Sequence, residues 1–351
     1  MSNPFTLSFG KEPQEYIKRI NEYDEIIETF NSNNPMTNLF IITGVRGAGK
    51  TVLLSSLYKY FDNNDDYIAI DLNTTVNMLE DFSAKLYDKT PKKIKSLRAE
   101  FSFSFHGLTI SLKGEEPVSS VSLLLEKMLN KIKKSGKKVV ITVDDIDTGD
   151  YMKTFVKEFQ SLYRKDLPIY LIVTGLYNVV DTLEKQEGLT FLQRGQKRYL
   201  TPLNRRYIIS SYKEIFNIDD KLACSLADLT KGYAFAFQTL GYLFYESDKR
   251  EINAALLKEY DYYLEEYVYR RLYAELSEKE KNILKHISLS NLESNKELVE
   301  AGVVTNQEIS NYKEKLFKRG ICDIKERGKI TIILPRFKEY IVYRTSEENS
   351  Y

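Results

Sequence analysis

A glycine-rich octapeptide, GVRGAGKT, runs from Gly44 to Thr51 and joins two segments of different character. The run before it, Leu39 to Thr43 (LFIIT), is short and apolar, which predicts a strand buried on both faces. After it, the apolar residues of Lys50 to Tyr60 recur at helical spacing. A strand, a glycine turn and a helix in this order predict the first unit of an α/β domain.

Short apolar runs and amphipathic segments continue to alternate as far as Leu200. The sequence predicts further strands at Tyr67 to Asp71, Val139 to Val143, Ile169 to Val173 and Lys197 to Leu200, and helices at Pro13 to Phe30, 76–88 and Val118 to Lys134. This alternation indicates an αβα fold with a parallel sheet. Glu100 to Lys113 instead alternates with period two and breaks at Gly107, which predicts a hairpin insertion at 98–116.

The strand pattern ends at Pro202. Residues 204–276 have the spacing of several helices, the last from Ile252 to Leu276. Ser277 and Glu280 then predict a capping box that opens another helix. The remaining pattern is three helices and two short strands, Ile321 to Glu326 and Lys329 to Leu334, which is the order of a winged helix-turn-helix. We expect three domains, at 1–201, 202–276 and 277–345.

The octapeptide has the pattern GxxxxGK[ST] of a phosphate-binding loop (the Walker A motif). Glycines let backbone N–H groups turn toward phosphates, and the N-terminus of the next helix adds positive potential. Lys50 would neutralise the β- and γ-phosphates, and Thr51 would ligate Mg²⁺. The expected nucleotide contacts come from Gly44, Val45, Arg46, Gly47, Ala48, Gly49, Lys50 and Thr51. No [NT]KxD element follows, which favours ATP over GTP, while the alternative is a glycine turn that binds nothing.

Acidic residues follow the strand at Val139 to Val143. A phosphate loop needs a carboxylate at a strand end to hold the metal ion, and Asp144 is the candidate for this Mg²⁺ shell. Asp145 is placed to polarise the attacking water. Thr174 ends the next strand and would lie near the γ-phosphate, where it could sense that group or orient water. The alternative for each of these residues is ordinary turn chemistry after a strand.

Bulk properties restrict the class of protein. The formal net charge of +1 means that a nucleic-acid surface would have to be local. No apolar run approaches the length of a membrane span, and no secretory signal is evident, so we expect a cytoplasmic protein without a membrane partner. The two cysteines, Cys224 and Cys322, and the two histidines, His106 and His286, lack the spacing of a zinc site.

Together, the phosphate loop, VVITVDDID, LIVTG and the segment from Phe191 to Leu203 resemble AAA+ ATPases. Within that group they are similar to archaeal and bacterial ATPases related to origin-recognition proteins. The resemblance implies ATP held between an αβα domain and a helical lid at a subunit interface, and hence a homo-oligomer. It also implies that Tyr16, Ile17 and Arg19 flank the adenine. Arg194 corresponds to an arginine finger that acts on the neighbouring subunit's nucleotide, with Arg198 as the alternative.

Two positions depart from this family pattern. Asp145 stands where a glutamate is usual, so its carboxylate reaches about one methylene less far, which leaves open slow hydrolysis or an ATP-dependent switch. Gln238 stands where the lid commonly carries an arginine, which puts in doubt a coupling of lid closure to the γ-phosphate.

The 277–345 segment has 14 basic and 10 acidic residues, a surplus that suits phosphate contact. The candidate contacts to duplex DNA are Lys313, Lys315, Lys318, Arg319, Arg327 and Lys329, on or after the third helix and around the wing. Glu308 and Glu314 on that helix oppose DNA binding, and contact with a protein is the alternative.

The sequence is therefore compatible with three functions. The first is an AAA+-like ATPase that hydrolyses ATP with Mg²⁺ and couples nucleotide state to DNA binding or remodelling. The second is an ATP-dependent regulatory switch in signalling or defence whose C-terminal domain binds proteins. The third is a small-molecule kinase, for which Arg205 and Arg206 are the paired cations available.

Overall fold

The computed structural model describes residues 2–8, 13–90, 101–102, 111–112, 121–247 and 250–348. The chain forms two units. The sheet unit comprises Ile20–Thr43 and Thr51–Arg198, and the helical unit comprises Met1–Arg19, Gly44–Lys50 and Tyr199–Tyr351. Residues Gly44–Lys50 of the phosphate loop belong to the helical unit, whereas the residues directly before and after them belong to the sheet unit.

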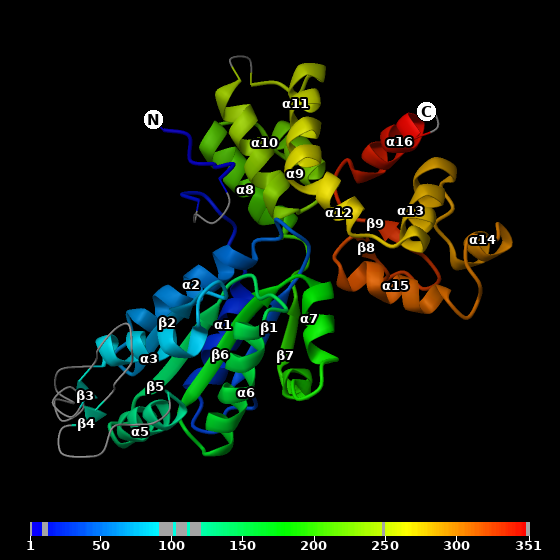
Figure 1. The fold of residues 1–351 in the computed structure, drawn as a ribbon. Coiled ribbons are helices and arrows are strands. Elements are labelled where there is room, and N and C mark those ends of the chain that lie inside the picture. Colours follow the sequence, from blue (N-terminus) through cyan, green and yellow to red (C-terminus); the bar gives the residue numbers. More distant parts are fainter. Residues whose placement is uncertain are drawn as a thin grey trace. The chain divides into compact units, whose positions relative to one another are not determined.

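The sheet unit is built on five strands in the order β2-β5-β6-β1-β7 (Figure 1). Their bounds are β1 Leu39–Thr43, β2 Tyr67–Leu72, β5 Lys138–Val143, β6 Ile169–Gly175 and β7 Gln196–Tyr199. The pairs β1–β6, β2–β5 and β5–β6 are parallel. All residues of β1 and β6 are buried, because helices cover both faces of the sheet. The predicted parallel α/β fold is confirmed.

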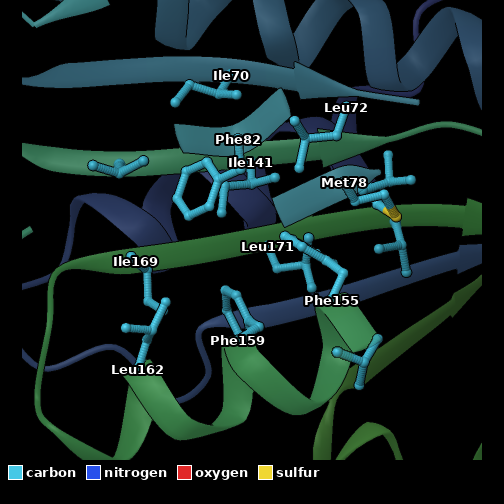
Figure 2. Close-up of a cluster of buried hydrophobic side chains, with 14 of the residues drawn as sticks. Ile70, Leu72, Met78, Phe82, Ile141, Phe155, Phe159, Leu162, Ile169 and Leu171 are labelled. Carbon is cyan, nitrogen blue, oxygen red and sulfur yellow. The ribbon is translucent and has the colours of Figure 1, made fainter. Parts of the chain in front are cut away.

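Helices of the sheet unit are α1 Ile20–Asn31, α2 Lys50–Asp62, α3 Met78–Lys89, α5 Val121–Lys134, α6 Asp150–Arg164 and α7 Tyr177–Glu184, followed by the 3₁₀ turn η1 Thr190–Arg194. Every third or fourth residue of α6 is apolar, and this stripe packs Phe155 and Phe159 against the sheet (Figure 2). On the other face, Phe30 of α1 contacts Phe40 and Tyr170. Each such aromatic side chain stabilises the fold by roughly 1.5–3 kcal/mol through burial.

The first helix is shorter than its periodicity predicts. It begins at Ile20 rather than near Pro13. The backbone before Ile20 forms hydrogen bonds outside a helix: Glu15 N–H donates to Pro4 O at 3.2 Å, and Gln238 Nε2 donates to Glu15 O at 2.6 Å. The segment is thus extended because its backbone groups are used outside a helix.

The hairpin insertion is present as the antiparallel pair β3 Phe101–Ser102 and β4 Ser111–Leu112, with Phe101 opposite Leu112. The remainder of the predicted hairpin, including Gly107 and the alternating residues Phe103 and Phe105, lies outside the described residues.

Helices make up the part of the helical unit that follows the sheet unit in the sequence, as predicted. They are α8 Arg205–Phe216, α9 Asp220–Thr230, α10 Ala234–Glu246, α11 Ala254–Leu264, the π-helical turn η2 Glu265–Tyr269 and α12 Arg270–Ala274. The single helix expected from Ile252 to Leu276 is therefore interrupted by η2, where Arg270 N–H donates to Glu265 O across one extra residue.

The C-terminal module contains α13 Glu278–Ser290, α14 Asn295–Glu300, α15 Ile309–Lys318, β8 Cys322–Asp323, β9 Thr331–Ile332 and α16 Phe337–Glu348. The predicted capping box is confirmed, since Glu280 N–H donates to Ser277 Oγ and Ser277 N–H donates to the Glu280 carboxylate. Helix α16 was not expected. The winged-helix assignment and the three domain boundaries stay predictions. Within the described residues, each helix is too short or too polar to cross a lipid bilayer.

Candidate functional site

The phosphate loop adopts a conformation that depends on its glycines. Gly47 and Gly49 have φ angles of +75° and +90°, in the region that favours glycine. Lys50 Nζ donates to Gly44 O at 3.0 Å and to Val45 O at 3.1 Å. Ala48 N–H also donates to Val45 O, at 3.1 Å. The loop therefore wraps around the ammonium group that the motif assigns to the β- and γ-phosphates.

Tyr233 and Phe235, which the sequence analysis does not select as site residues, contact this loop. The Tyr233 hydroxyl donates a hydrogen bond to Arg46 O. Phe235 N–H donates to Gly47 O at 3.0 Å. The sequence feature that could have identified them is their position just before Gln238, which the family resemblance selects. In other respects both have the pattern of aromatic core residues. Burial raises the pKa of the Tyr233 hydroxyl well above its ordinary value, so it remains a donor at physiological pH.

The segment assigned to the adenine also reaches the loop. The Arg19 guanidinium donates to Ala48 O at 2.9 Å and to Thr201 O at 2.7 Å. Tyr16 and Ile17 lie in the same non-helical segment and are half-buried. Their role beside the adenine stays a prediction, whereas Arg19 has direct contact with the phosphate loop.

Asp144 is the centre of a hydrogen-bonded group in the sheet unit. It follows β5, and both of its carboxylate oxygens accept hydrogen bonds. Thr51 Oγ1 donates to one oxygen at 2.8 Å, and Thr174 Oγ1 donates to the other at 2.5 Å. Thr51 comes from the first turn of α2 and Thr174 from the end of β6. The structure thus brings together three residues that the sequence selected separately.

Thr174 is wholly buried and makes a second contact, because its Oγ1 accepts the N–H of Asp145 at 2.9 Å. Asp145 itself has a φ of +50°, and its side chain is exposed. The left-handed turn sends the two neighbouring acids in different directions: one carboxylate is bound by hydroxyls and the other faces solvent. The hydroxyl proton of Thr174 is already committed to Asp144, so in this conformation Thr174 holds the acid.

The donor set fits Mg²⁺. A threonine hydroxyl and a carboxylate are hard oxygen ligands, and Mg²⁺ is usually held by one or two such groups together with nucleotide phosphates and water. In the described ranges, no group of three or more His, Cys, Asp or Glu side chains could form an all-protein metal cage. The pair Thr51 and Asp144 is therefore suited to a metal ion that arrives with a nucleotide.

The two candidate finger arginines differ in their surroundings. Arg194 ends η1 with an exposed side chain, and none of the described residues forms a hydrogen bond or an ion pair with that side chain. Arg198 instead forms a forked ion pair with Glu25 and lies 5.5 Å from the centre of the Phe40 ring. The pair lowers the pKa of Glu25 chiefly through the hydrogen bond from Arg198. Arg198 is thus occupied within its own unit.

Gln238 binds the chain's N-terminal segment. Its Oε1 accepts Thr6 N–H at 3.0 Å, and its Nε2 donates to Glu15 O at 2.6 Å. Phe5 anchors the same segment with 3% exposure and sits so close to Gly241 that a Cβ there would lie 2.6 Å from the Phe5 ring. Gln238 therefore links α10 to the segment that precedes α1.

Among the six DNA candidates, two are committed inside the C-terminal module. Lys313 lies on the buried face of α15 with 9% exposure, and burial lowers its pKa. Arg319 forms an ion pair with the buried Glu280, with a nitrogen–oxygen distance of 3.2 Å. Charge and spacing alone predict both residues as basic contacts to DNA. The helical period of α15 turns Lys313 inward with Ile309 and Leu316, which weakens its assignment to DNA.

The other four DNA candidates are at least partly accessible. Lys318 pairs with Glu314, and Lys329 pairs with Glu326 at 2.5 Å. Lys315 is exposed and lies 5.5 Å from the centre of the Tyr312 ring. Arg327, at the tip between β8 and β9, is exposed, and the described part of the chain supplies no ion-pair partner for it.

Comparison with known proteins shows likeness in fold at low sequence identity. A family profile described as Nephrocystin 3, N-terminal, matches residues 20–175, which are fewer than half of the chain. A sequence search of curated proteins gives no match.

Among solved structures, a Walker-type ATPase of Pyrococcus abyssi has a TM-score of 0.63 and 14% identity, over 93% of this chain and 96% of that one. The ORC2 protein of Aeropyrum pernix, in ADPNP–ADP complexes, has a TM-score of 0.55 and 13% identity, over 98% of both chains. The resemblance predicted from the motifs is confirmed at the level of the fold alone, which this chain shares with these two proteins.

Proposed function

We propose that the chain is an ATPase that binds ATP with Mg²⁺, hydrolyses it slowly, and uses the nucleotide state to control the contacts of its C-terminal module. The observation that carries the proposal is the binding of both Asp144 oxygens by the hydroxyls of Thr51 and Thr174. Thr51 directly follows Lys50 in the sequence, so the metal ligand and the phosphate-binding lysine serve one nucleotide. The likeness in fold to a protein solved with ADPNP and ADP supports an adenine nucleotide.

Each residue has a defined part in this proposal. Bound Mg²⁺ supplies positive charge at the phosphate oxygens. The Thr51 hydroxyl would offer its lone pair to the metal ion while it donates its own proton in the hydrogen bond of 2.8 Å to the Asp144 carboxylate, so this hydrogen bond already orients the ligand. Lys50 leaves the loop carbonyls that it now contacts and neutralises the β- and γ-phosphates.

Hydrolysis depends on the second acid. Asp145 is exposed and can accept a proton from water or orient it, and its short side chain limits how closely it approaches the γ-phosphate. Thr174 fixes the Asp145 backbone through its N–H and fixes Asp144 through its carboxylate. We therefore assign Thr174 to the positioning of both acids.

Measurements of ATP binding and phosphate release test the proposal. Lys50→Ala should abolish ATP binding, and Asp144→Asn should raise the Mg²⁺ concentration needed for half-maximal phosphate release. Asp145→Asn should leave ATP binding within about twofold of wild type and lower turnover by about 10²-fold or more, the usual contribution of a general base. If Lys50→Ala binds ATP as wild type does, the nucleotide site is wrongly assigned.

We further propose that the active form is a homo-oligomer in which Arg194 completes the site of the neighbouring subunit. Its side chain is exposed and has no ion-pair partner among the described residues, which supports this role, and the Glu25 pair disfavours Arg198. An Arg194→Ala protein mixed with a Lys50→Ala protein tests the idea. Mixed assemblies place intact Arg194 beside an intact phosphate loop, so activity should reappear; Arg198→Ala should give no such rescue. Failure of rescue in assemblies that demonstrably mix contradicts a role in trans.

For the C-terminal module we propose contact with duplex DNA through Lys315 and Arg327, because Lys329 is paired with Glu326. Their exposure supports this function, as does the basic surplus of the segment. Contact with a protein partner is the alternative, favoured by the burial of Lys313 and the ion pair of Arg319. Titration of labelled duplex DNA with and without ATP separates them, because absence of salt-sensitive binding in both states leaves the protein-binding switch.

A further inference from the structure

Three consecutive carbonyl groups of the phosphate loop are held from outside the loop. Arg46 O accepts the Tyr233 hydroxyl, and Gly47 O accepts Phe235 N–H at 3.0 Å. Ala48 O accepts the Arg19 guanidinium at 2.9 Å. All these groups belong to the helical unit. The donors come from the lid and from the N-terminal segment, two regions that lie far apart in the sequence.

The planarity of the peptide bond converts these contacts into an orientation of the loop amides. In a trans peptide the C=O of one residue and the N–H of the next point in opposite directions. Each of the held carbonyls at Arg46, Gly47 and Ala48 therefore directs the N–H group that follows it away from the residue that holds the carbonyl. The N–H of Ala48 and Lys50 Nζ both donate to Val45 O, at 3.1 Å each.

We propose that Tyr233 and Arg19 are positioning residues for the nucleotide, which hold the loop carbonyls so that the loop amides face the phosphates. This inference rests on the proposed function, since it assigns the residues that shape the same phosphate site.

Close packing around Gly47 supports the role of Tyr233. A Cβ added at Gly47 would lie 2.5 Å from the Tyr233 hydroxyl and 2.8 Å from the Phe235 Cβ. The hydroxyl is therefore packed directly on the loop backbone, with no space for water between them. Its raised pKa keeps it protonated, so its hydrogen bond does not vary through the neutral pH range.

Arg19 serves as a bridge. One guanidinium nitrogen donates to Ala48 O at 2.9 Å, and the other donates to Thr201 O at 2.7 Å. A lysine at this position could donate to one of the two carbonyls but could not span both in the same planar geometry. Arg19→Lys thus keeps the charge and loses the bridge.

The test compares two tyrosines of the same unit. Tyr233→Phe removes the hydroxyl that holds the loop. Tyr212→Phe is the matched control, because Tyr212 is also buried and its hydroxyl donates to a backbone carbonyl at 2.7 Å, that of Phe237 and not one of the loop. Each change removes one neutral hydrogen bond, so thermal unfolding should shift by similar amounts.

ATP affinity, measured by calorimetry with Mg²⁺ present, separates the two roles. We expect Tyr233→Phe and Arg19→Lys to weaken ATP binding by about threefold to tenfold, the range of one hydrogen bond, with Tyr212→Phe unchanged. If Tyr233→Phe and Tyr212→Phe bind ATP equally well, the positioning role is refuted. Wild-type protein that fails to bind ATP would instead refute the proposed function, so the two failures are distinguishable.

Discussion

Replacement of Thr174 by valine removes a hydroxyl at the centre of the acid group and keeps the shape of the side chain. Two hydrogen bonds are lost: the 2.5 Å bond to the Asp144 carboxylate and the 2.9 Å bond from Asp145 N–H. A hydrogen bond to a charged group contributes about 1.5–3 kcal/mol, and a buried N–H left without an acceptor costs about 1–3 kcal/mol. Since Thr174 is wholly buried, water cannot easily replace the lost partner.

We therefore expect Thr174→Val to lower the free energy of unfolding by about 2–4 kcal/mol, less than the full sum because the acids can relax toward solvent. Urea unfolding measures this change. Thr174→Ser is the matched control, because it keeps both hydrogen bonds and loses one buried methyl group, at about 1 kcal/mol. The same pair should differ in function: Thr174→Val should need more Mg²⁺ for half-maximal phosphate release, and Thr174→Ser should resemble wild type.

The refuting result is specific. If Thr174→Val unfolds at the same urea concentration as wild type, or if Thr174→Ser is the less stable of the two, the hydroxyl does not hold the acids. A stability loss without any change in Mg²⁺ dependence would separate the structural contribution of Thr174 from the metal site and would remove Asp144 from the Mg²⁺ shell.

Three further changes test the surrounding structure. Gly47→Ala places a Cβ 2.5 Å from the Tyr233 hydroxyl at a φ of +75°, so ATP binding should fall by more than about tenfold, as calorimetry would show. Phe5→Ala empties an almost fully buried ring site and should cost about 3 kcal/mol in urea unfolding. The lowered pKa of Glu25 stabilises the fold above the ordinary glutamate range, and this contribution is lost as the pH falls through the lowered value. Glu25→Gln should therefore lose most stability near neutral pH and match wild type in acid; a pH-independent difference would mean that the Arg198 pair does not form.

The sheet was predictable because its signal is local. A strand buried on both faces appears in the sequence as a short apolar run, and the run LFIIT coincides with β1 at both ends. Asp144 was predictable for the same reason, since it directly follows such a run. Its contact with Thr174 followed from the order of the strands, because β5 and β6 are neighbours and end at the same edge.

The contacts of the loop carbonyls could not be predicted. Tyr233 and Arg46 are separated by 187 positions, and the acceptor is a backbone oxygen that every residue type carries. No residue type in the sequence therefore identifies the hydrogen-bond partner of Tyr233. Phe5 is a similar case: a single aromatic residue near the N-terminus has no periodic pattern, and its site exists only because Gly241 leaves room for the ring. The inward turn of Lys313 is predictable from the helical period, since Ile309 and Leu316 share its helical face, whereas its charge alone predicts an exposed position.

The ion pairs of the C-terminal module set a limit on DNA binding that salt dependence can measure. A basic residue releases counterions only if it is free to neutralise a phosphate, and each such contact contributes about −0.9 to the slope of log affinity against log salt. Lys313 is buried and Arg319 is bound to Glu280. Lys318 and Lys329 would have to leave their glutamate partners.

Lys315 and Arg327 then remain as the candidates without an ion-pair partner in the described part of the chain, so we expect a slope of about −2 for duplex DNA, compared with about −5 if all six basic candidates took part. Fluorescence anisotropy over a salt series gives the slope directly. Lys315→Ala together with Arg327→Ala should bring it close to zero, while Lys318→Ala should change it little because that charge is already neutralised. A slope near −5 would show that DNA displaces the glutamates, and the module would then be a stronger DNA-binding surface than its ion pairs indicate.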